Sequence, residues 1–303
     1  MQYIKDNNFL QEGNAEYVRN TTKHQSCLHI EFVSIVLSKA EEEGGNRGSA
    51  DCFIVRTRAP VSEYNVGMSE QPIGIFDSGV GGLKILAALR KVLPRENYIY
   101  VFDRSHSPYG NRSNRYIKKR AEKVSEMLIK EGAKTVVVAC NTATNVGITR
   151  LREKFGVPFV GVEPPLKPAA AAHKEGKILV LCTCRTAVQE KFLRLKEKYD
   201  DGSVTVIPLP NLARDIENNF TSLKDLKPVV DGIFSPYDGD NVESVVLGCT
   251  HYYYVKDLID AHFGGKVKIY DACDGVARRL KDVLTQNDLP AQKNIGKVRY
   301  IYI

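Results

Sequence analysis

Two cysteines occupy matching positions in the two halves of this 303-residue chain. Cys140 ends the run Thr-Val-Val-Val-Ala-Cys, and Cys249 ends the run Ser-Val-Val-Leu-Gly-Cys. Short polar residues and an amphipathic stretch follow each thiol, a pattern typical of a strand, a sharp turn and a helix. If the two halves face each other, one thiol flanks each side of a bound substrate. An acid and a base on opposite faces of one carbon perform racemisation or epimerisation.

The residues around each thiol suit proton transfer. A helix N-terminus favours a thiolate, so we expect the pKa of Cys140 to lie below the free value of about 8.5. Beyond Cys249 stand Thr250 and His251. His251 can hydrogen-bond the thiol and assist proton transfer, or it can be a core or capping residue. A third loop at 77–82, Asp-Ser-Gly-Val-Gly-Gly, permits close backbone approach but lacks the glycine spacing of a dinucleotide site.

The elements that position these residues alternate between strands and helices from Pro72 onward. Several predicted strands are apolar throughout, as expected when helices cover both faces of a parallel sheet. Ser113 is the expected N-cap of a helix that runs to about Lys130. We therefore predict the α/β class, with two doubly wound units and the site in the cleft between them. The predicted strands are 73–76, 98–102, 135–139, 158–162, 177–181, 204–207, 245–247 and 267–270.

Residues 1–69 differ from the rest of the chain. Short apolar pieces at 30–37 and 52–55 stand among acidic and glycine-rich stretches. We expect an extension of unknown role with weak or partial order. Met68 lies just before the first clear strand and is an alternative start.

Composition excludes several other classes of protein. The net charge of +7 comes from Lys and Arg spread over predicted helices as solvated faces, and no nucleic-acid-binding motif is present. No apolar run approaches a membrane span, and no secretory signal is recognisable. The seven cysteines lack the spacing of a disulfide framework, which indicates reduced thiols in a cytoplasmic protein. Cys182 and Cys184 have no second ligand pair, so we expect no metal.

Five motifs together resemble the glutamate racemase family. The match runs from about Pro72 to at least Val276 and leaves residues 1–69 outside. In chain order the motifs are Pro-Ile-Gly-Ile-Phe-Asp-Ser-Gly-Val-Gly-Gly-Leu at 72–83, Pro-Tyr-Gly at 108–110, Val-Ala-Cys-Asn-Thr-Ala-Thr at 138–144, Gly-Val-Glu-Pro at 161–164 and Leu-Gly-Cys-Thr-His-Tyr at 247–252.

The resemblance implies an isomerase that interconverts L- and D-glutamate without a cofactor and supplies D-glutamate for peptidoglycan. It implies two pseudosymmetric α/β domains, 70–163 plus 273–303 with Cys140, and 164–272 with Cys249. It also implies a homodimer. Some extended family members are activated by a UDP-linked peptidoglycan precursor, and the segment 1–69 motivates the same hypothesis here.

The resemblance also implies residue roles. Cys140 would take the α-proton from D-glutamate, and Cys249 would take it from L-glutamate. The positions expected to assist catalysis are Asp77, Asp103, Glu163 and His251. The positions expected to hold the substrate are Asp77, Ser78, Tyr109, Gly110, Asn141, Thr142, Thr186, Thr250 and His251.

Departures from the family pattern leave the expected chemistry in place. Phe102 and Arg104 flank Asp103 where the family commonly has Gly and Thr, and Tyr253 and Tyr254 replace a usual Pro-Leu pair. Three alternatives stay open. One is an aspartate racemase of the same family, since one methylene gives only about 1–3 kcal/mol of discrimination. The others are a binding or regulatory protein on this scaffold, and a cysteine hydrolase, which gives no reason for a second matched thiol.

Overall fold

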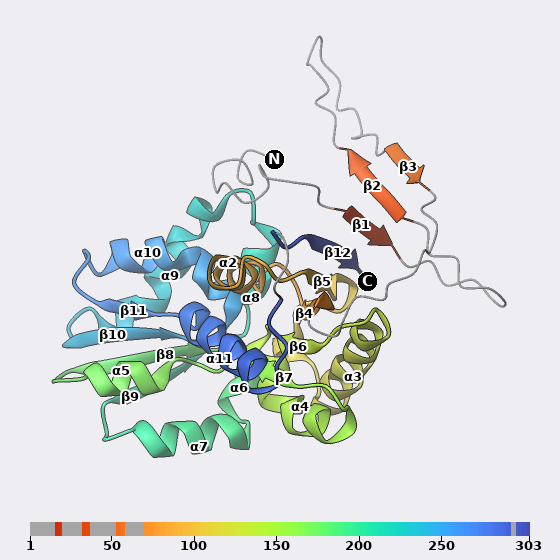
Figure 1. The fold of residues 1–303 in the computed structure, drawn as a ribbon. Helices are drawn as coiled ribbons and strands as arrows, with labels where there is room; N and C mark the ends of the chain where they lie inside the picture. The colour runs from red at the N-terminus through yellow and green to blue at the C-terminus, as the bar shows by residue number, and fades with distance from the viewer. Residues whose placement is uncertain (1–15, 20–31, 37–52, 58–69, 292–294) are drawn as a thin grey trace, which may run out of the picture.

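The computed structural model describes residues 16–19, 32–36, 53–57, 70–291 and 295–303, with side chains from residue 70 onward. Two sheets organise the chain, and helices pack around both (Figure 1). The first sheet has eight strands in the order β3-β2-β1-β12-β5-β4-β6-β7, and the second has four in the order β11-β10-β8-β9. This arrangement confirms the predicted α/β class.

The strands of the first sheet that lie nearest the candidate site are parallel. β4 (Ile73–Asp77) lies between β5 (Tyr98–Phe102) and β6 (Thr135–Val138), and β7 (Phe159–Gly161) pairs with β6. In this register Asp77 stands opposite Phe102, and Phe76 stands opposite Val138. The residues that follow the three strands therefore meet at one edge of the sheet.

The second sheet is parallel throughout. Its strands are β8 (Lys177–Cys182), β9 (Val204–Pro208), β10 (Val242–Leu247) and β11 (Lys268–Tyr270). Leu247 pairs with Leu181, so the residues after β10 and β8 also share one edge. The predicted strands between residues 73 and 270 are confirmed, with shifts of a few residues at some ends.

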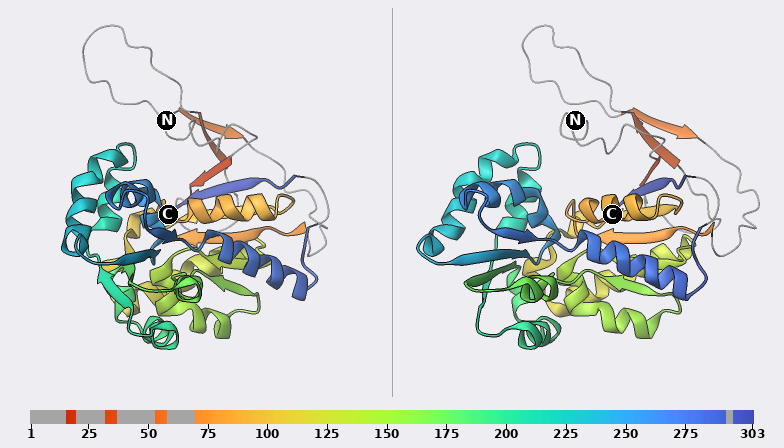
Figure 2. Two further views of the ribbon diagram at one scale, coloured as in Figure 1. Left: turned by 90° about the vertical axis from the view of Figure 1, so that its left-hand side faces the viewer. Right: turned by 60° about the vertical axis from the view of Figure 1, so that its left-hand side comes forward.

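Helices cover both faces of the first sheet, as its apolar strands predict. α3 (Asn114–Lys130) and α4 (Asn141–Lys154) pack on one face, and α2 (Leu83–Val92) and α11 (Cys273–Gln286) pack on the other (Figures 1 and 2). The predicted cap of α3 is confirmed, because the Ser113 hydroxyl accepts a hydrogen bond from the Tyr116 main-chain N–H at 3.2 Å.

Helices and short helical turns also surround the second sheet. They are α5 (Leu166–Ala172), α6 (Cys184–Ala187), α7 (Glu190–Tyr199), α8 (Leu212–Asn218), α9 (Lys227–Phe234) and α10 (Lys256–His262). The 3₁₀ turns of the second half are η4 (Leu223–Leu226), η5 (Ser235–Tyr237) and η6 (Thr250–Val255), whereas η2 (Arg104–His106) and η3 (Tyr109–Asn111) follow β5 of the first sheet.

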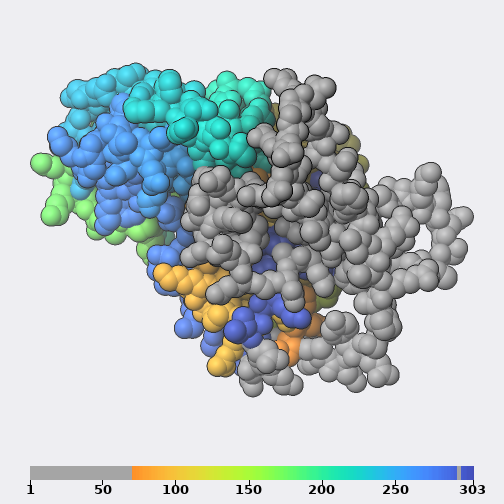
Figure 3. All heavy atoms as spheres, turned by 90° about the horizontal axis from the view of Figure 1, so that it is seen from above, coloured from red at the N-terminus to blue at the C-terminus, as the bar shows by residue number. Residues whose placement is uncertain are grey.

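The C-terminal part of the chain returns to the first sheet. α11 packs against α2, and β12 (Val298–Tyr302) pairs in parallel with β5. The largest hydrophobic cluster joins α2 and α11 to strands β8 and β10 of the second sheet, so the two sheets share a core. On the face seen in Figure 3, α2 adjoins the blue surface of the later chain. Because α11 and β12 return to the first sheet, we propose the domain division 70–163 plus 273–303 and 164–272.

Three strands in the segment 1–69 extend the first sheet. β1 (Glu16–Arg19) pairs in parallel with β12, and β2 (Phe32–Val36) and β3 (Phe53–Thr57) add antiparallel strands. Sequence analysis identified apolar pieces where β2 and β3 lie but predicted no strand there. Most of the segment, for which weak or partial order was expected, and Met68 lie outside the described residues.

Candidate active site

Both matched cysteines lie at the carboxyl ends of parallel strands, where open α/β sheets bind ligands. Cys140 follows β6 and is the N-cap residue of α4. Cys249 follows β10 and precedes the 3₁₀ helix η6, where the sequence predicted an ordinary helix start. The two residues are only 5% and 6% exposed, respectively. The structure therefore holds each thiol in a protected position at a strand end.

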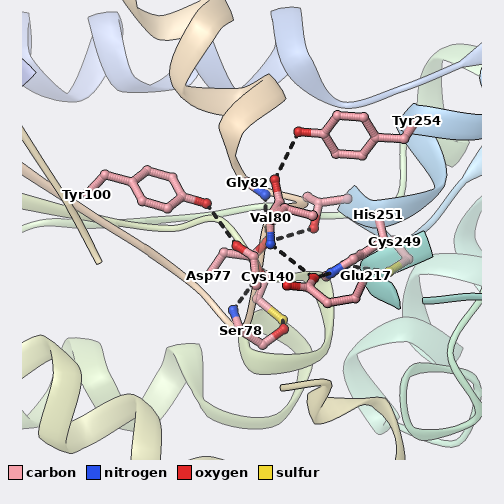
Figure 4. A network of polar contacts seen from close by, with 12 residues as sticks. Asp77, Ser78, Val80, Gly82, Tyr100, Cys140, Glu217, Cys249, His251 and Tyr254 are labelled. Atoms are coloured by element: carbon pink, nitrogen blue, oxygen red, sulfur yellow. Dashed lines mark hydrogen bonds and ion pairs between the residues drawn. The ribbon is translucent and has the colours of Figure 1, made fainter. Parts of the chain in front are cut away.

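The carboxylate of Asp77 links the loop after β4 to the second half of the chain. It accepts hydrogen bonds from the main-chain N–H groups of Ser78 at 2.8 Å and Gly82 at 2.6 Å. The Thr250 hydroxyl donates to it at 3.3 Å. Burial raises the pKa of Asp77 to about 6, against the lowering effect of the His251 charge. Figure 4 shows this network from close by.

The glycines of the 77–82 loop permit the second half to come very close. A Cβ atom on Gly81 would lie 2.5 Å from the Thr250 hydroxyl oxygen and 2.7 Å from the His251 main-chain nitrogen. A Cβ on Gly79 would lie 2.3 Å from a carboxylate oxygen of Glu217. Close approach therefore explains why small residues occupy these positions.

Cys140 differs electrostatically from the sequence-based expectation. Its sulfur lies 3.7 Å from the Ser78 hydroxyl oxygen, and either group can donate the hydrogen bond. Burial, together with the nearby charge of Asp77, raises the pKa of the Cys140 thiol well above its ordinary value. The expectation of a lowered pKa at the helix N-terminus is wrong for this state, because desolvation outweighs the hydrogen bond from the Ala143 main-chain N–H.

Cys249 stands next to a partly buried ion pair between His251 and Glu217. Its sulfur lies 3.9 Å from Nδ1 of His251, and Nε2 of His251 lies 2.7 Å from Oε2 of Glu217. Burial alone would lower the pKa of His251, but hydrogen bonds to Cys249 and Glu217 raise it well above its ordinary value. Burial likewise opposes the ionised Glu217, yet its contact with His251 lowers the pKa of that carboxyl overall. The favoured form of His251 is therefore the imidazolium, and its Nδ1 faces the sulfur of Cys249.

Glu217 is the residue of this site that sequence analysis missed. It lies on α8, and its Oε2 atom also accepts the main-chain N–H of Val80 at 3.2 Å. A glutamate in a polar helical stretch is ordinary in sequence, so only the tertiary structure singles it out. The expected Glu163 is exposed instead, and it forms an ion pair with Lys191 at 2.5 Å. The carboxylate beside His251 is therefore that of Glu217.

Short polar side chains line the helix N-terminus next to Cys140. The hydroxyl oxygen of Thr142 lies 3.0 Å from that of Thr183 and 3.5 Å from that of Thr186, so hydroxyls of both halves meet here. Asn141 donates to the Val162 carbonyl at 3.5 Å. The buried side-chain oxygen of Asn141 has no hydrogen-bond partner among the described residues. This buried acceptor is available to a donor group of a ligand.

Asp103 is buried and lies next to the predicted Pro-Tyr-Gly motif. Arg120 donates to its two carboxylate oxygens at 3.0 and 2.5 Å, and the Tyr109 hydroxyl also donates to it. Gly110 packs so closely on Thr183 that a Cβ would lie 2.9 Å from the Thr183 methyl carbon. Asp103 thus holds Tyr109 in place through its hydrogen bond, and the ion pair with Arg120 fixes Asp103 itself.

Two absences concern the residues that the structure describes. That part of the chain contains no group of three or more His, Cys, Asp or Glu side chains arranged to hold a metal ion. Its helices are also too short or too polar to cross a membrane.

Comparison with known proteins defines the class. The family model for Asp/Glu/hydantoin racemases matches residues 83–280. A glutamate racemase of Clostridium perfringens is 41% identical over 227 residues, which are 74% of this chain and 87% of the relative. The chain therefore belongs to the Asp/Glu/hydantoin racemase family.

Solved structures place it near the glutamate racemases in particular. A glutamate racemase isoform of Bacillus anthracis superposes with a TM-score of 0.70 at 30% identity, over 77% of this chain and 89% of that one. The Escherichia coli glutamate racemase, solved in complex with L-glutamate and the activator UDP-MurNAc-Ala, superposes with a TM-score of 0.68 at 26% identity, over 77% and 98%. These similarities confirm the resemblance that the five motifs indicated.

Proposed function

We propose that this protein interconverts L- and D-glutamate by proton transfer between Cα of the substrate and two cysteines, without a cofactor. The observation that carries the proposal is the placement of Cys140 and Cys249 at the carboxyl ends of parallel strands, one in each sheet. Each thiol has its own polar partner, Ser78 for one and His251 for the other. The relatives named as glutamate racemases support glutamate over aspartate as the substrate.

The reaction needs one thiolate and one thiol. The thiolate removes the α-proton, and the other thiol donates its proton to the opposite face of the same carbon, so no net oxidation occurs. Cys140 would act as the base toward D-glutamate, and Cys249 would act as the base toward L-glutamate. After each turnover the two groups have exchanged protonation states, which readies the enzyme for the opposite isomer.

The neighbouring groups favour this exchange in different ways. The imidazolium of His251 lies close enough to stabilise a Cys249 thiolate, and Glu217 in turn stabilises the imidazolium. Cys140, whose thiol is favoured by burial, is the natural proton donor in the same state. Deprotonation by Cys249 and reprotonation by Cys140 then convert L-glutamate to D-glutamate.

Charge that develops on the substrate's α-carboxylate must also be stabilised. Asn141 and Thr142 begin α4, and Thr250 begins η6, so main-chain N–H groups and short polar side chains surround the expected reaction centre. Preorganised donors of this kind act strongly where water is excluded. The side-chain oxygen of Asn141, which has no partner among the described residues, can accept a hydrogen bond from the substrate ammonium group.

We further propose that the product D-glutamate supplies peptidoglycan synthesis, and that the enzyme works as a homodimer in the cytoplasm. Free thiols are required for the mechanism, and the described cysteines are unpaired. The activator in the E. coli structure supports the hypothesis that a UDP-linked precursor activates this enzyme too. Racemisation rates with and without that precursor, for the full chain and for a variant lacking residues 1–67, test this hypothesis.

The decisive experiment is incubation with L-glutamate in D₂O without added cofactor, followed by optical rotation and deuterium incorporation at Cα. Loss of rotation with deuterium at Cα is expected. Cys140→Ser and Cys249→Ser should each reduce racemisation by at least about a thousandfold, because a serine hydroxyl is a far weaker acid than a thiol and is not deprotonated to act as the base. Turnover of aspartate but not glutamate would shift the substrate assignment. Absence of exchange with both amino acids would favour the binding-protein alternative.

A further inference from the structure

Tyr254 connects the second half of the chain to the 77–82 loop of the first half. It lies in η6, the 3₁₀ helix that follows Cys249. Its hydroxyl donates a hydrogen bond to the main-chain carbonyl of Val80 at 3.0 Å. The side chain is half-buried, and Figure 4 shows it reaching toward the loop from the opposite side to Tyr100.

Two further contacts fix the ring of Tyr254 in this orientation. The Phe220 ring packs edge-on against it, with centroids 4.9 Å apart and an interplanar angle of 77°. The Lys84 ammonium group lies 5.2 Å from the ring centroid, in cation–π range. Lys84 belongs to α2 of the first half and Phe220 follows α8 of the second, so the tyrosine ring joins elements from both halves.

The peptide groups on both sides of Val80 are thereby held by the second half. The Val80 N–H donates to Glu217, and the Val80 carbonyl accepts from Tyr254. The same Oε2 atom of Glu217 contacts His251, whose other ring nitrogen faces the sulfur of Cys249. A continuous series of polar contacts therefore runs from the Tyr254 hydroxyl to the Cys249 thiol.

Cys140 depends on a different anchor. Its neighbour Ser78 is held by its own main-chain hydrogen bond to the Asp77 carboxylate, at the end of β4. The Val80 carbonyl also accepts from the Leu83 N–H at 3.1 Å, so the turn itself does not require the tyrosine hydroxyl. Loss of that hydroxyl should loosen the contacts toward Cys249 more than those toward Cys140.

From these contacts we propose that Tyr254 is a positioning residue that holds the Val80 peptide against Glu217 and so favours proton transfer at Cys249. This inference rests on the proposed function for its kinetic consequences. The hydroxyl itself does not touch the reacting atoms. Since the family pattern places Leu at this position, the device belongs to this chain's own sequence.

The test compares Tyr254→Phe with Tyr253→Phe. The first variant removes the hydroxyl bound to Val80 and keeps the ring. The second removes a neighbouring buried hydroxyl that accepts the main-chain N–H of Ala272 at 3.3 Å, away from the loop. Both variants lose one hydrogen bond, so a general loss of stability should appear in both.

One readout is amide hydrogen exchange in the free protein, which needs no catalytic activity. Exchange at the Val80 amide should accelerate about two- to tenfold in Tyr254→Phe, the range expected for a single hydrogen bond, and stay unchanged in Tyr253→Phe. Unchanged exchange at Val80 in Tyr254→Phe would overturn the inference. If Tyr254→Phe accelerates exchange at Val80 but the wild-type protein racemises nothing, the proposed function is overturned and the positioning role of Tyr254 stands.

The second readout separates the two thiols. If the step at Cys249 slows selectively, the primary isotope effect should rise with L-[2-²H]glutamate and fall with D-[2-²H]glutamate, while kcat/KM drops about two- to tenfold in Tyr254→Phe. Tyr253→Phe should leave both isotope effects at their wild-type values. Equal isotope effects in wild type and Tyr254→Phe, with or without a slower rate, would show a merely structural role and refute the proposal.

Discussion

Replacing Glu217 by glutamine isolates the charge that faces His251. One oxygen, Oε2, makes both contacts of this side chain, with Nε2 of His251 at 2.7 Å and with the Val80 N–H at 3.2 Å. A glutamine oxygen in the same place keeps both hydrogen bonds and removes only the negative charge. Glu217 is 13% exposed and His251 2%, so solvent screens the pair weakly.

The expected effect follows from that geometry. A hydrogen bond between charged groups contributes about 1.5–3 kcal/mol and a neutral one about 0.5–1.5, so the substitution should cost roughly 1–2 kcal/mol. This corresponds to a loss of about 5- to 30-fold in kcat/KM, and to a fall of about one unit in the pKa of His251. Because the wild-type pKa of His251 is raised, the variant loses the imidazolium at lower pH. The alkaline limb of the pH profile should therefore move toward acid by about one unit.

The assay is circular dichroism at several pH values with L-glutamate as substrate. Glu163→Gln is the matched control, because Glu163 is 47% exposed and pairs only with Lys191 among the described residues. Its effect on kcat/KM should stay below about twofold. An unmoved alkaline limb in Glu217→Gln, or a larger loss in Glu163→Gln, would refute the assignment of Glu217 as the partner of His251.

Three further substitutions test the packing and electrostatics. In Gly81→Ala the new Cβ would lie 2.5 Å from the Thr250 hydroxyl oxygen of the second half. A cost of roughly 1–3 kcal/mol for this clash should lower kcat/KM by about 5- to 150-fold. The control Gly275→Ala has open space around its Cβ and should leave activity unchanged. Lys134→Met removes the buried ion-pair partner of the Glu96 carboxylate, so the free energy of unfolding measured in urea should fall by about 3–5 kcal/mol. Adding Glu96→Gln to this variant removes the uncompensated charge and should restore part of the lost stability. The pKa of Asp77 is raised to about 6, so its stabilising effect is complete below its unfolded pKa and is lost as pH rises through 6. Asp77→Asn should therefore gain up to about 3 kcal/mol relative to wild type between pH 4 and pH 7, and a constant difference across that range would contradict the raised pKa.

Much of the site could be predicted because strand ends and loop motifs are local in sequence. The runs that end at Cys140 and Cys249 show uninterrupted apolar strands followed by short polar residues, and a parallel sheet brings such ends to one edge. The pKa of Cys140 was predicted in the wrong direction, because helix position is visible in sequence while the extent of desolvation is not. Glu163 was expected to assist catalysis because it lies in a motif, yet its side chain is 47% exposed and forms an ion pair with Lys191.

The sequence by itself determined the α/β class, the approximate bounds of the strands between residues 73 and 270, the cap of α3 and the family to which the chain belongs. Each of these depends on periodicity, turn chemistry or motifs within short segments. Only the tertiary structure decided that Glu217 meets His251 and that Tyr254 reaches Val80. Those partners come from helical turns and loops far apart in the chain. The strand β12 was likewise recognisable only from its pairing with β5, because its alternating residues resemble many exposed segments until a partner strand satisfies their main-chain groups.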